Sequence, residues 1–443
     1  MACTRRAHKG LGESMRHSTQ SFLWAIAVGV AGTSLCRAQD GAVFPGRKGG
    51  QDTFGHYAVV ADWPKPLSQL PGHAAWTYGA GQSVFAVSPD RVFVLQRGEL
   101  PVLERPATRR VRDIGASLEF PVFRLPVRDA TVASPPAGGA AGAMPPDGLK
   151  AWQEQGGVLG VDARWEHCIL VFDRNGNIVE DWTQWDSMLA RPHAVYVSPY
   201  DPEQHIWIVD DFRHAIFKFT NDGKKLVQTI GTVNEHGADA THFFRPTFMA
   251  WLPDGSFFVA DGYENTRVVK FDANGKYLTA WGQKGTPPND TRPGYLNNVH
   301  GIAVDPRTRR VFVNDRANNR AQVFDENGKF LDQWGFGGPP SDIHLFLMAS
   351  DGYLWVADRG TSKILKYSLD GTLLYSWGTW GTFPGGFWGV HGMSVDTEGN
   401  FYVAEVDTGR VQKFKPLPDT EPRYLVAPST LPARGASATP RRP

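Results

Sequence analysis

Cysteine is scarce in this chain. The 443 residues include three cysteines, and two of them, Cys3 and Cys36, lie in an N-terminal segment with the pattern of a removable leader. Without that segment only Cys168 remains, so an internal disulfide is excluded and stability must come from packing. A charge excess is also lacking: 46 basic and 45 acidic residues give a formal net charge of +1. We therefore predict no nucleic-acid partner.

The apolar run FLWAIAVGVAG at 22–32 is too short to span a bilayer comfortably. It follows a basic, polar start and precedes Cys36-Arg37-Ala38, which has small residues at the positions that signal peptidase recognises. We interpret 1–38 as a signal peptide with Met1 or Met15 as initiator, an uncleaved anchor being the alternative. This predicts export to a periplasmic or extracellular space, with no stable membrane insertion after cleavage.

A repeated pattern of short strands occupies most of the chain. Within 300–335, the segments 301–304, 310–313, 321–324 and 329–334 alternate apolar and polar residues, as strands with one buried face do. Asn327-Gly328 separates the last two and predicts a two-residue type I′ turn. The unit is therefore a four-stranded antiparallel meander.

Related units flank this one. Its second strand recurs as IWIVDD, FFVADG, LWVADR and FYVAEV, and its third and fourth strands recur in segments such as VVKFDANGKYLTAWG. Five units are visible from residue 193 onward, and a sixth can be assembled from SVFAVSPDRVFVLQRG and CILVFDRNGNIVEDW. Six such sheets predict an all-β, six-bladed β-propeller. Trp281, Trp334 and Trp377, at matching ends of fourth strands, are expected to fill the space between sheets.

We predict that the propeller covers 56–416 and that the protein is a monomer. The last unit has three strands, so HYAVVADW at 56–63 is expected to complete its sheet and close the ring. Residues 39–55 are interpreted as a Gly-rich linker and 417–443 as a Pro-rich disordered tail. An insertion at 99–166 in the first blade is either a partly disordered excursion or a lid over the entrance of the ring.

Histidine gathers at one position of the repeat. Aligned first strands place Ser83, His193, Thr247, His300, His344 and His391 at the same ring position. First strands line the channel of a propeller, and alternate blades are about 120° apart. His193, His300 and His391 then form the three-ligand face of a zinc site with an open fourth position, although each can also be a hydrogen-bonded channel residue. His344 can hydrogen-bond to a ligand of the metal, contact the substrate or simply line the channel.

Loops after the second strands should surround this position. Arg97 in VLQRGEL can hold a carboxylate or a developing oxyanion, and Tyr263 in ADGYENTR can serve as a general base. The acidic residues that end the second strands are interpreted as turn carboxylates that accept backbone N–H groups. These residues are Asp210, Asp261, Asp315 and Asp358, with Asn265, Arg267, Asn318 and Arg320 in the same scaffold.

These motifs carry a resemblance. The repeats look like NHL repeats, and RPHAVYVSP, ADGYENTR, NVHGIAVDP, GVHGMSVD and LQRG resemble segments of the peptidyl-α-hydroxyglycine α-amidating lyases. The resemblance implies zinc on His193, His300 and His391, Tyr263 as base and Arg97 as substrate-binding group. It also implies cleavage of a small-molecule or peptide α-hydroxyglycine to an amide and glyoxylate. A structural Ca²⁺ is implied through an acidic residue after the third zinc histidine, but Gly392 stands there.

Two other functions are compatible with a propeller. A binding or scaffold module needs no catalytic residues, because fold does not determine function. A calcium-dependent hydrolase of the lactonase type would line its channel with oxygen donors. The histidine-rich channel favours the zinc lyase over both.

Overall fold

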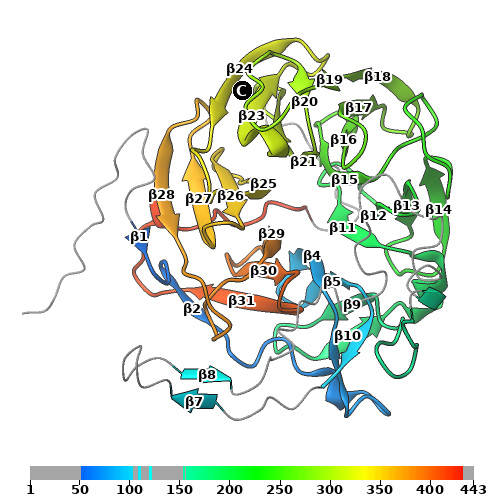
Figure 1. The fold of residues 1–443 in the computed structure, drawn as a ribbon, viewed down its shortest axis with the longest axis vertical. Helices are drawn as coiled ribbons and strands as arrows, with labels where there is room; N and C mark the ends of the chain where they lie inside the picture. Colours follow the sequence, from blue (N-terminus) through cyan, green and yellow to red (C-terminus); the bar gives the residue numbers. More distant parts are fainter. Residues whose placement is uncertain (1–50, 103–107, 111–118, 122–152, 155, 433–443) are drawn as a thin grey trace, which may run out of the picture. The chain divides into compact units, whose positions relative to one another are not determined.

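The computed structural model describes residues 51–102, 108–110, 119–121, 153–154 and 156–432, and these form six four-stranded antiparallel sheets arranged as a β-propeller (Figure 1). The signal-peptide interpretation and most of the 99–166 insertion lie outside the described residues. Within the described part, no helix is both long and apolar enough to cross a membrane.

Each blade runs from an inner strand at the channel to an outer strand at the rim. Blades 1 to 3 are β4 (Gly81–Ser88), β5 (Arg91–Gln96), β9 (Ile169–Phe172) and β10 (Ile178–Asp181); β11 (Pro192–Val197), β12 (Ile206–Asp210), β13 (Ala215–Phe219) and β14 (Leu226–Ile230); and β15 (Pro246–Trp251), β16 (Phe257–Asp261), β17 (Arg267–Phe271) and β18 (Tyr277–Trp281).

Blades 4 to 6 follow the same order. They are β21 (Val299–Asp305), β22 (Arg310–Asp315), β23 (Arg320–Phe324) and β24 (Phe330–Gly335); β25 (Ile343–Met348), β26 (Leu354–Asp358), β27 (Lys363–Tyr367) and β28 (Leu373–Trp377); and β29 (Val390–Val395), β30 (Phe401–Glu405), β31 (Arg410–Pro416) and the early strand β2 (Tyr57–Val59).

The remaining elements are short. They are β1 (Gln51–Asp52), the pairs β3 (Trp76–Tyr78) with β6 (Glu99–Pro101), β7 (Thr108–Arg110) with β8 (Glu119–Pro121) and β19 (Gln283–Lys284) with β20 (Tyr295–Leu296), and the 3₁₀ turns η1 (Leu67–Gln69), η3 (Thr183–Met188), η4 (Arg316–Asn318) and η5 (Pro422–Tyr424).

The ring is closed as the sequence predicts. β2 pairs antiparallel with β31, so an N-terminal strand supplies the fourth strand of blade 6 and removes an open sheet edge. The second strands differ from the expectation of one buried face: β12, β16 and β26 are buried at every position. They are buried on both faces because each sheet is packed between two neighbouring sheets.

Tryptophans at the ends of fourth strands fill the space between blades. The ring centroid of Trp281 in β18 lies 5.8 Å from Phe258 of its own blade and 5.9 Å from Phe324 of blade 4. Trp377 is fully buried and stacks on Tyr57 of blade 6 at 5.5 Å. The packing role predicted for these residues is confirmed.

The predicted type I′ turn at Asn327-Gly328 is wrong. Gly328 has a φ of +89°, but Asn327 is not among the described residues with positive φ. The Asp325 carboxylate accepts the N–H groups of Asn327 and Lys329, both at 2.9 Å, and Gly328 N–H donates to Asp325 O at 3.1 Å. The aspartate thus stabilises a longer turn in which only the glycine needs positive φ.

Two segments expected to be loose are folded in part. β1, in the predicted 39–55 linker, pairs parallel with β28 and adds a fifth strand to blade 5. In the predicted disordered tail, Val426 is 1% exposed and its N–H donates to Tyr57 Oη at 2.8 Å. The prediction of a disordered tail is wrong up to residue 432, because a proline-rich chain with no strand and only the short η5 turn still packs on the sheets. Residues 433–443 lie outside the described residues.

Candidate functional site

The three aligned histidines of alternate blades come together in the channel. His193 on β11, His300 on β21 and His391 on β29 are buried, and their ring centroids are 4.7 to 5.2 Å apart. Each offers a nitrogen within 4.8 Å of the others. Residues far apart along the chain therefore form one compact cluster of imidazoles.

A bulge at the start of each inner strand directs these side chains into the channel. Where an inner strand pairs with the second strand of its blade, the register shifts and leaves one or two residues unpaired, and such bulges re-aim side chains. The residues at these shifts are Gln82, His193, Thr247, Phe248, His300, Gly301, His344 and His391.

The bulges correct the sequence alignment in blade 1. Gly81 pairs with Gln96 and Ser83 with Leu95, so Gln82, not Ser83, occupies the ring position of the histidines. The Ser83 hydroxyl instead accepts the N–H of Val195 at 3.2 Å. A one-residue bulge shifts which side chain faces the channel, and alternation of residue types alone does not reveal it.

Backbone carbonyls determine the tautomers of two histidines. Nδ1–H of His300 donates to His344 O at 2.6 Å, and Nδ1–H of His391 donates to Gln82 O at 2.8 Å. Because a carbonyl can only accept, both rings carry their proton on Nδ1 and present the lone pair of Nε2. Nδ1 of His193 is buried and has no hydrogen-bond partner.

Burial, aided by neighbouring positive or titratable groups, lowers the pKa of all three rings well below the usual value. They are neutral at pH 7, which is the state that binds a metal ion. Three neutral imidazoles that converge, with Nε2 as the unprotonated nitrogen of His300 and His391, match the donor set of a three-histidine zinc centre.

Tyr263 lies directly at this cluster. It follows β16, and its hydroxyl is 3.0 Å from His193 Nε2 and 2.8 Å from His300 Nε2. The guanidinium of Arg245 lies 4.4 Å from the centroid of its ring. The Tyr263 oxygen is therefore held at the open side of the histidines.

Arg97 reaches the same place from the end of β5. Its side chain is 2% exposed, and its Nη2 donates to Gln82 Oε1 at 2.8 Å. Since Gln82 O accepts from His391, Gln82 connects the guanidinium to the histidine cluster. Burial and the nearby charge of Arg191 lower the pKa of Arg97 to about 9, although Asp211 and Tyr263 oppose this.

Several buried polar atoms of this region lack hydrogen-bond partners. An unpaired buried donor or acceptor costs roughly 1 to 3 kcal/mol, so a cluster of them indicates a place where a polar ligand, ion or water binds. Those carried by inner strands or by the loops next to them include Arg97 Nε, Gln82 Nε2, Arg191 Nε, His193 Nδ1 and His344 Nδ1.

His344 takes part differently from the other three histidines. Its ring lies 5.3 Å from His300 and 5.4 Å from His391, yet its Nε2 is 3.3 Å from Asp342 Oδ2. Burial and the charge of Arg316 lower its pKa to about 4. In the described residues, the group of possible metal ligands at the channel contains the other three histidines and excludes His344.

Four further residues of the site were missed by the sequence analysis. Phe248 forms an apolar wall, with its ring 4.9 to 5.4 Å from the three histidines. Arg245 binds the buried Asp211 carboxylate through Nε and Nη2, at 3.0 and 2.9 Å, and Arg191 lies 3.6 Å from the same carboxylate. The repeated RPH and RPT motifs could have revealed this arginine pair.

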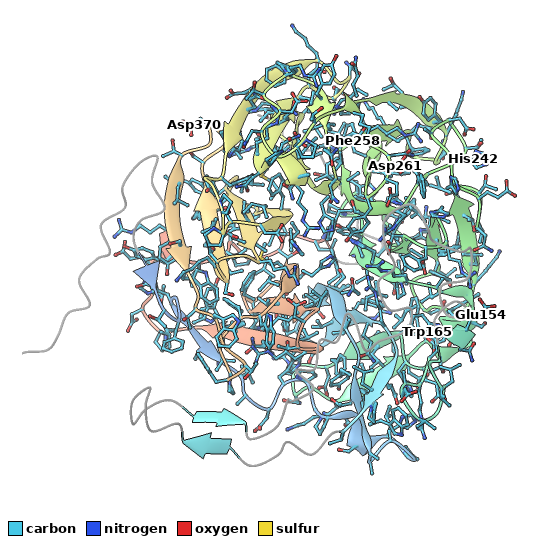
Figure 2. All side chains as sticks on the ribbon, viewed as in Figure 1. Glu154, Trp165, His242, Phe258, Asp261 and Asp370 are labelled. Atoms are coloured by element: carbon cyan, nitrogen blue, oxygen red, sulfur yellow. The ribbon has the colours of Figure 1, made fainter. Side chains whose placement is uncertain are left out.

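The repeated acidic residues serve the scaffold, as predicted. Asp210 accepts the N–H groups of Ala190 and Arg191 before the inner strand and of Phe212 and Arg213 in the following turn. Asp261 and Asp315 likewise bind the paired Asn and Arg side chains. Figure 2 shows Asp261 within blade 3. These carboxylates hold together the loops that carry Arg191 and Tyr263.

Gly392 leaves no room for the acidic residue on which a structural Ca²⁺ would depend. A Cβ at this position would lie 2.8 Å from Ser83 Cα. Contacts that short do not occur between carbon atoms, so any side chain would push blade 6 away from blade 1.

No family model matches the chain. Over 274 residues it is 29% identical to peptidyl-α-hydroxyglycine α-amidating lyase 1 of Drosophila melanogaster, covering 56% of this chain and 49% of that protein. It is 29% identical over 258 residues to peptidyl-glycine α-amidating monooxygenase A of Xenopus laevis, covering 57% of this chain and 27% of that protein. The chain resembles the amidating lyases. It spans half or less of these two relatives.

Two other similarities are broader in coverage. Human NHL repeat-containing protein 3 is 28% identical over 282 residues, which is 58% of this chain and 75% of that protein. The structure of virginiamycin B lyase from Staphylococcus aureus shares 13% identity with a TM-score of 0.43, over 77% of this chain and 98% of that one. A structural likeness this low says nothing about function.

Proposed function

We propose that this protein is a zinc-dependent lyase that cleaves the C–N bond of a peptidyl-α-hydroxyglycine-like substrate. The products are an amide and glyoxylate. The observation that carries the proposal is the meeting of three buried neutral imidazoles, a tyrosine hydroxyl within 3.0 Å of two of them and a buried arginine. The relatives named as amidating lyases support the same reaction class.

His193, His300 and His391 would hold the ion. Zinc in such a centre supplies Lewis acidity, which makes a nearby hydroxyl easier to deprotonate. Tyr263 is the base: its oxygen removes the proton of the substrate hydroxyl. The C–O bond then gains double-bond character, the C–N bond breaks with its electron pair on nitrogen, and that nitrogen takes the proton back from Tyr263 to become the amide.

Arg97 binds the carboxylate that becomes part of glyoxylate. Its charge is buried, and its Nε has no hydrogen-bond partner in the protein. A guanidinium in that state can pair with a carboxylate through two parallel hydrogen bonds. Phe248 on one side keeps water away from the reacting atoms, which strengthens these interactions.

Glyoxylate release from α-hydroxyhippurate tests the proposal. Purified protein is expected to contain zinc and to release glyoxylate, to lose release on chelation and to regain it with added Zn²⁺. His300→Ala should abolish both zinc at this centre and release. His242→Ala, a histidine at the rim of the ring in Figure 2, is the matched control and should change neither.

The alternatives predict other results. Metal-free protein without release would indicate a binding or scaffold propeller. Calcium dependence would indicate the lactonase-type hydrolase, which the nitrogen donor set of the channel disfavours. Export is part of the proposal and is tested by N-terminal sequencing of the secreted chain, expected to begin after Ala38.

A further inference from the structure

A second cluster of potential ligands lies at the base of the blade 1 insertion. It combines His73, between η1 and β3, with Glu99 at the start of β6 and with Glu166 and His167, which precede β9. None of these residues belongs to the histidine centre of the channel. Figure 2 shows Trp165, the neighbour of this cluster, away from the channel beside blade 1.

The buried Glu99 carboxylate contacts both imidazoles. It is 0% exposed; its Oε2 is 2.8 Å from His73 Nδ1 and its Oε1 is 2.5 Å from His167 Nδ1. Two ligands on one tetrahedral ion would be roughly 3.3 Å apart, given metal–ligand bonds of about 2.0 Å. The observed distances are those of hydrogen bonds, so Glu99 accepts Nδ1–H from both rings.

In the neutral state of each ring, this arrangement leaves the lone pair on Nε2. A carboxylate that accepts Nδ1–H is the usual partner of a metal-binding histidine, because it determines the tautomer and raises the basicity of Nε2. Glu166 Oε2 lies 3.9 Å from His73 Nε2, and the Glu166 side chain is 51% exposed. His73, Glu99, Glu166 and His167 each offer one possible ligand atom, and these atoms lie within 4.8 Å of one another.

The cluster faces an open pocket of about 640 Å³. His73, Glu166 and His167 line it, together with Trp165 and Asp186. Asp186 is itself held, since its carboxylate accepts the N–H groups of His167 at 2.8 Å and Cys168 at 3.0 Å. The backbone that carries His167 is thus rigid, whereas the pocket leaves room for further ligands on an ion.

We propose that His73, His167 and Glu166 bind a divalent first-row transition-metal ion, with Glu99 as the carboxylate that orients both histidines. Two nitrogens and one oxygen suit Zn²⁺ and its neighbours in the series rather than Ca²⁺ or Mg²⁺. The ion joins the segment before β4 to both ends of the 99–166 insertion. Because Glu99 is two residues from Arg97, the ion also fixes the turn that positions Arg97.

Metal stoichiometry of the full chain tests this proposal. Protein saturated with Zn²⁺ and then desalted is expected to hold two ions per chain by elemental analysis. His73→Gln should hold only the channel ion, and His300→Ala should hold only the ion at the blade 1 cluster. The double variant should hold none. If the channel centre fails to bind zinc, the wild type holds one ion and His73→Gln none, so the two proposals fail separately.

A substitution at a half-exposed position, with a matched control, separates loss of metal binding from misfolding. Glu166→Gln changes a half-exposed side chain and should weaken Zn²⁺ at this site at least tenfold in a chelator competition. Glu203→Gln is the control, because Glu203 also lies beside a histidine and a second carboxylate, at 3.1 Å from His205 Nε2. A wild-type zinc count in His73→Gln, or equal affinities in Glu166→Gln and wild type, would overturn the proposal and leave a metal-free ion-pair cluster.

Discussion

At the scale of single residues, the proposed chemistry depends most directly on the Tyr263 hydroxyl, 2.8 Å from His300 Nε2. Tyr263→Phe removes the proton acceptor but none of the nitrogen ligands. We expect zinc content to stay at the wild-type value and kcat for glyoxylate release to fall about 10²- to 10⁴-fold. Tyr277→Phe, on the outer strand β18, should leave kcat unchanged; zinc loss in Tyr263→Phe would argue for a structural role.

His214 provides a pH prediction at the same scale. Burial lowers its pKa to about 4, and its Nδ1 accepts the N–H of Arg245 at 3.3 Å. Between pH 4 and the unfolded-state pKa of about 6.5, the unfolded chain binds a proton that the native protein does not. The free energy of unfolding is therefore not reduced by this residue well above pH 6.5. It falls as the pH drops below 6.5, by about 2 kcal/mol at pH 5.

The variant His214→Asn isolates this effect, because asparagine tolerates the positive φ of +55° at this position. The free energy of unfolding of both proteins is measured with denaturant from pH 7.5 to 4.5. It should fall less steeply with decreasing pH in the variant than in the wild type. A difference between the two proteins that stays constant with pH would show that His214 does not titrate in this range.

At the scale of the elements, the hairpin turn of one blade packs on the tryptophan of the blade before it. A Cβ on Gly328 would lie 2.7 Å from the Trp281 ring, and φ is +89°. Gly328→Ala is therefore expected to destabilise the protein by roughly 1 to 3 kcal/mol. Gly338→Ala, where nothing lies within 4 Å of the added Cβ, should be close to neutral in the same thermal unfolding assay.

The segment after β31 is a second element with a testable role. It runs from blade 6 across the centre of the ring in Figure 1, and contacts Asp396, Ser350 and, through Pro432, Gln204 of blade 2. These partners follow inner strands, at the channel end opposite the histidines. A chain ending at Pro416 should lose roughly 2 to 4 kcal/mol of stability, since it exposes Val426 and breaks several hydrogen bonds.

A chain ending at Pro432 is the control for this truncation, because it keeps all of these contacts. Its melting temperature should equal that of the full chain. Equal melting temperatures for the chains ending at 416 and 432 would show that the segment contributes nothing to stability.

At the scale of the whole molecule, the proposed channel ion joins blades 2, 4 and 6. An ion that binds only the folded ring stabilises it by about 4 kcal/mol when its free concentration is 1,000 times Kd. The melting temperature should therefore rise with Zn²⁺ and fall on chelation. His300→Ala should lose the part of this rise that the channel ion supplies, whereas His73→Gln should retain that part. An equal rise in His300→Ala and the wild type would place the stabilising ion elsewhere.

Much of this architecture is readable from the sequence, because it follows from local repetition. Alternating segments, turn glycines and the recurring tryptophans Trp281, Trp334 and Trp377 predict four-stranded sheets, and the missing strand of the last unit predicts closure by β2. The same repetition predicts that His193, His300 and His391 share one axis. Each of these inferences needs only that equivalent residues in equivalent blades occupy equivalent places.

The tertiary structure decided what repetition does not encode. The bulges put Gln82 rather than Ser83 at the ring position, since pairing with the neighbouring strand sets the register. Packing of 417–432 on the sheets, and the meeting of His73 with Glu99 and His167, depend on contacts between segments that occur once in the chain. Repeated positions can be placed from sequence because symmetry relates them, whereas unique contacts are set by the packing of the folded ring alone.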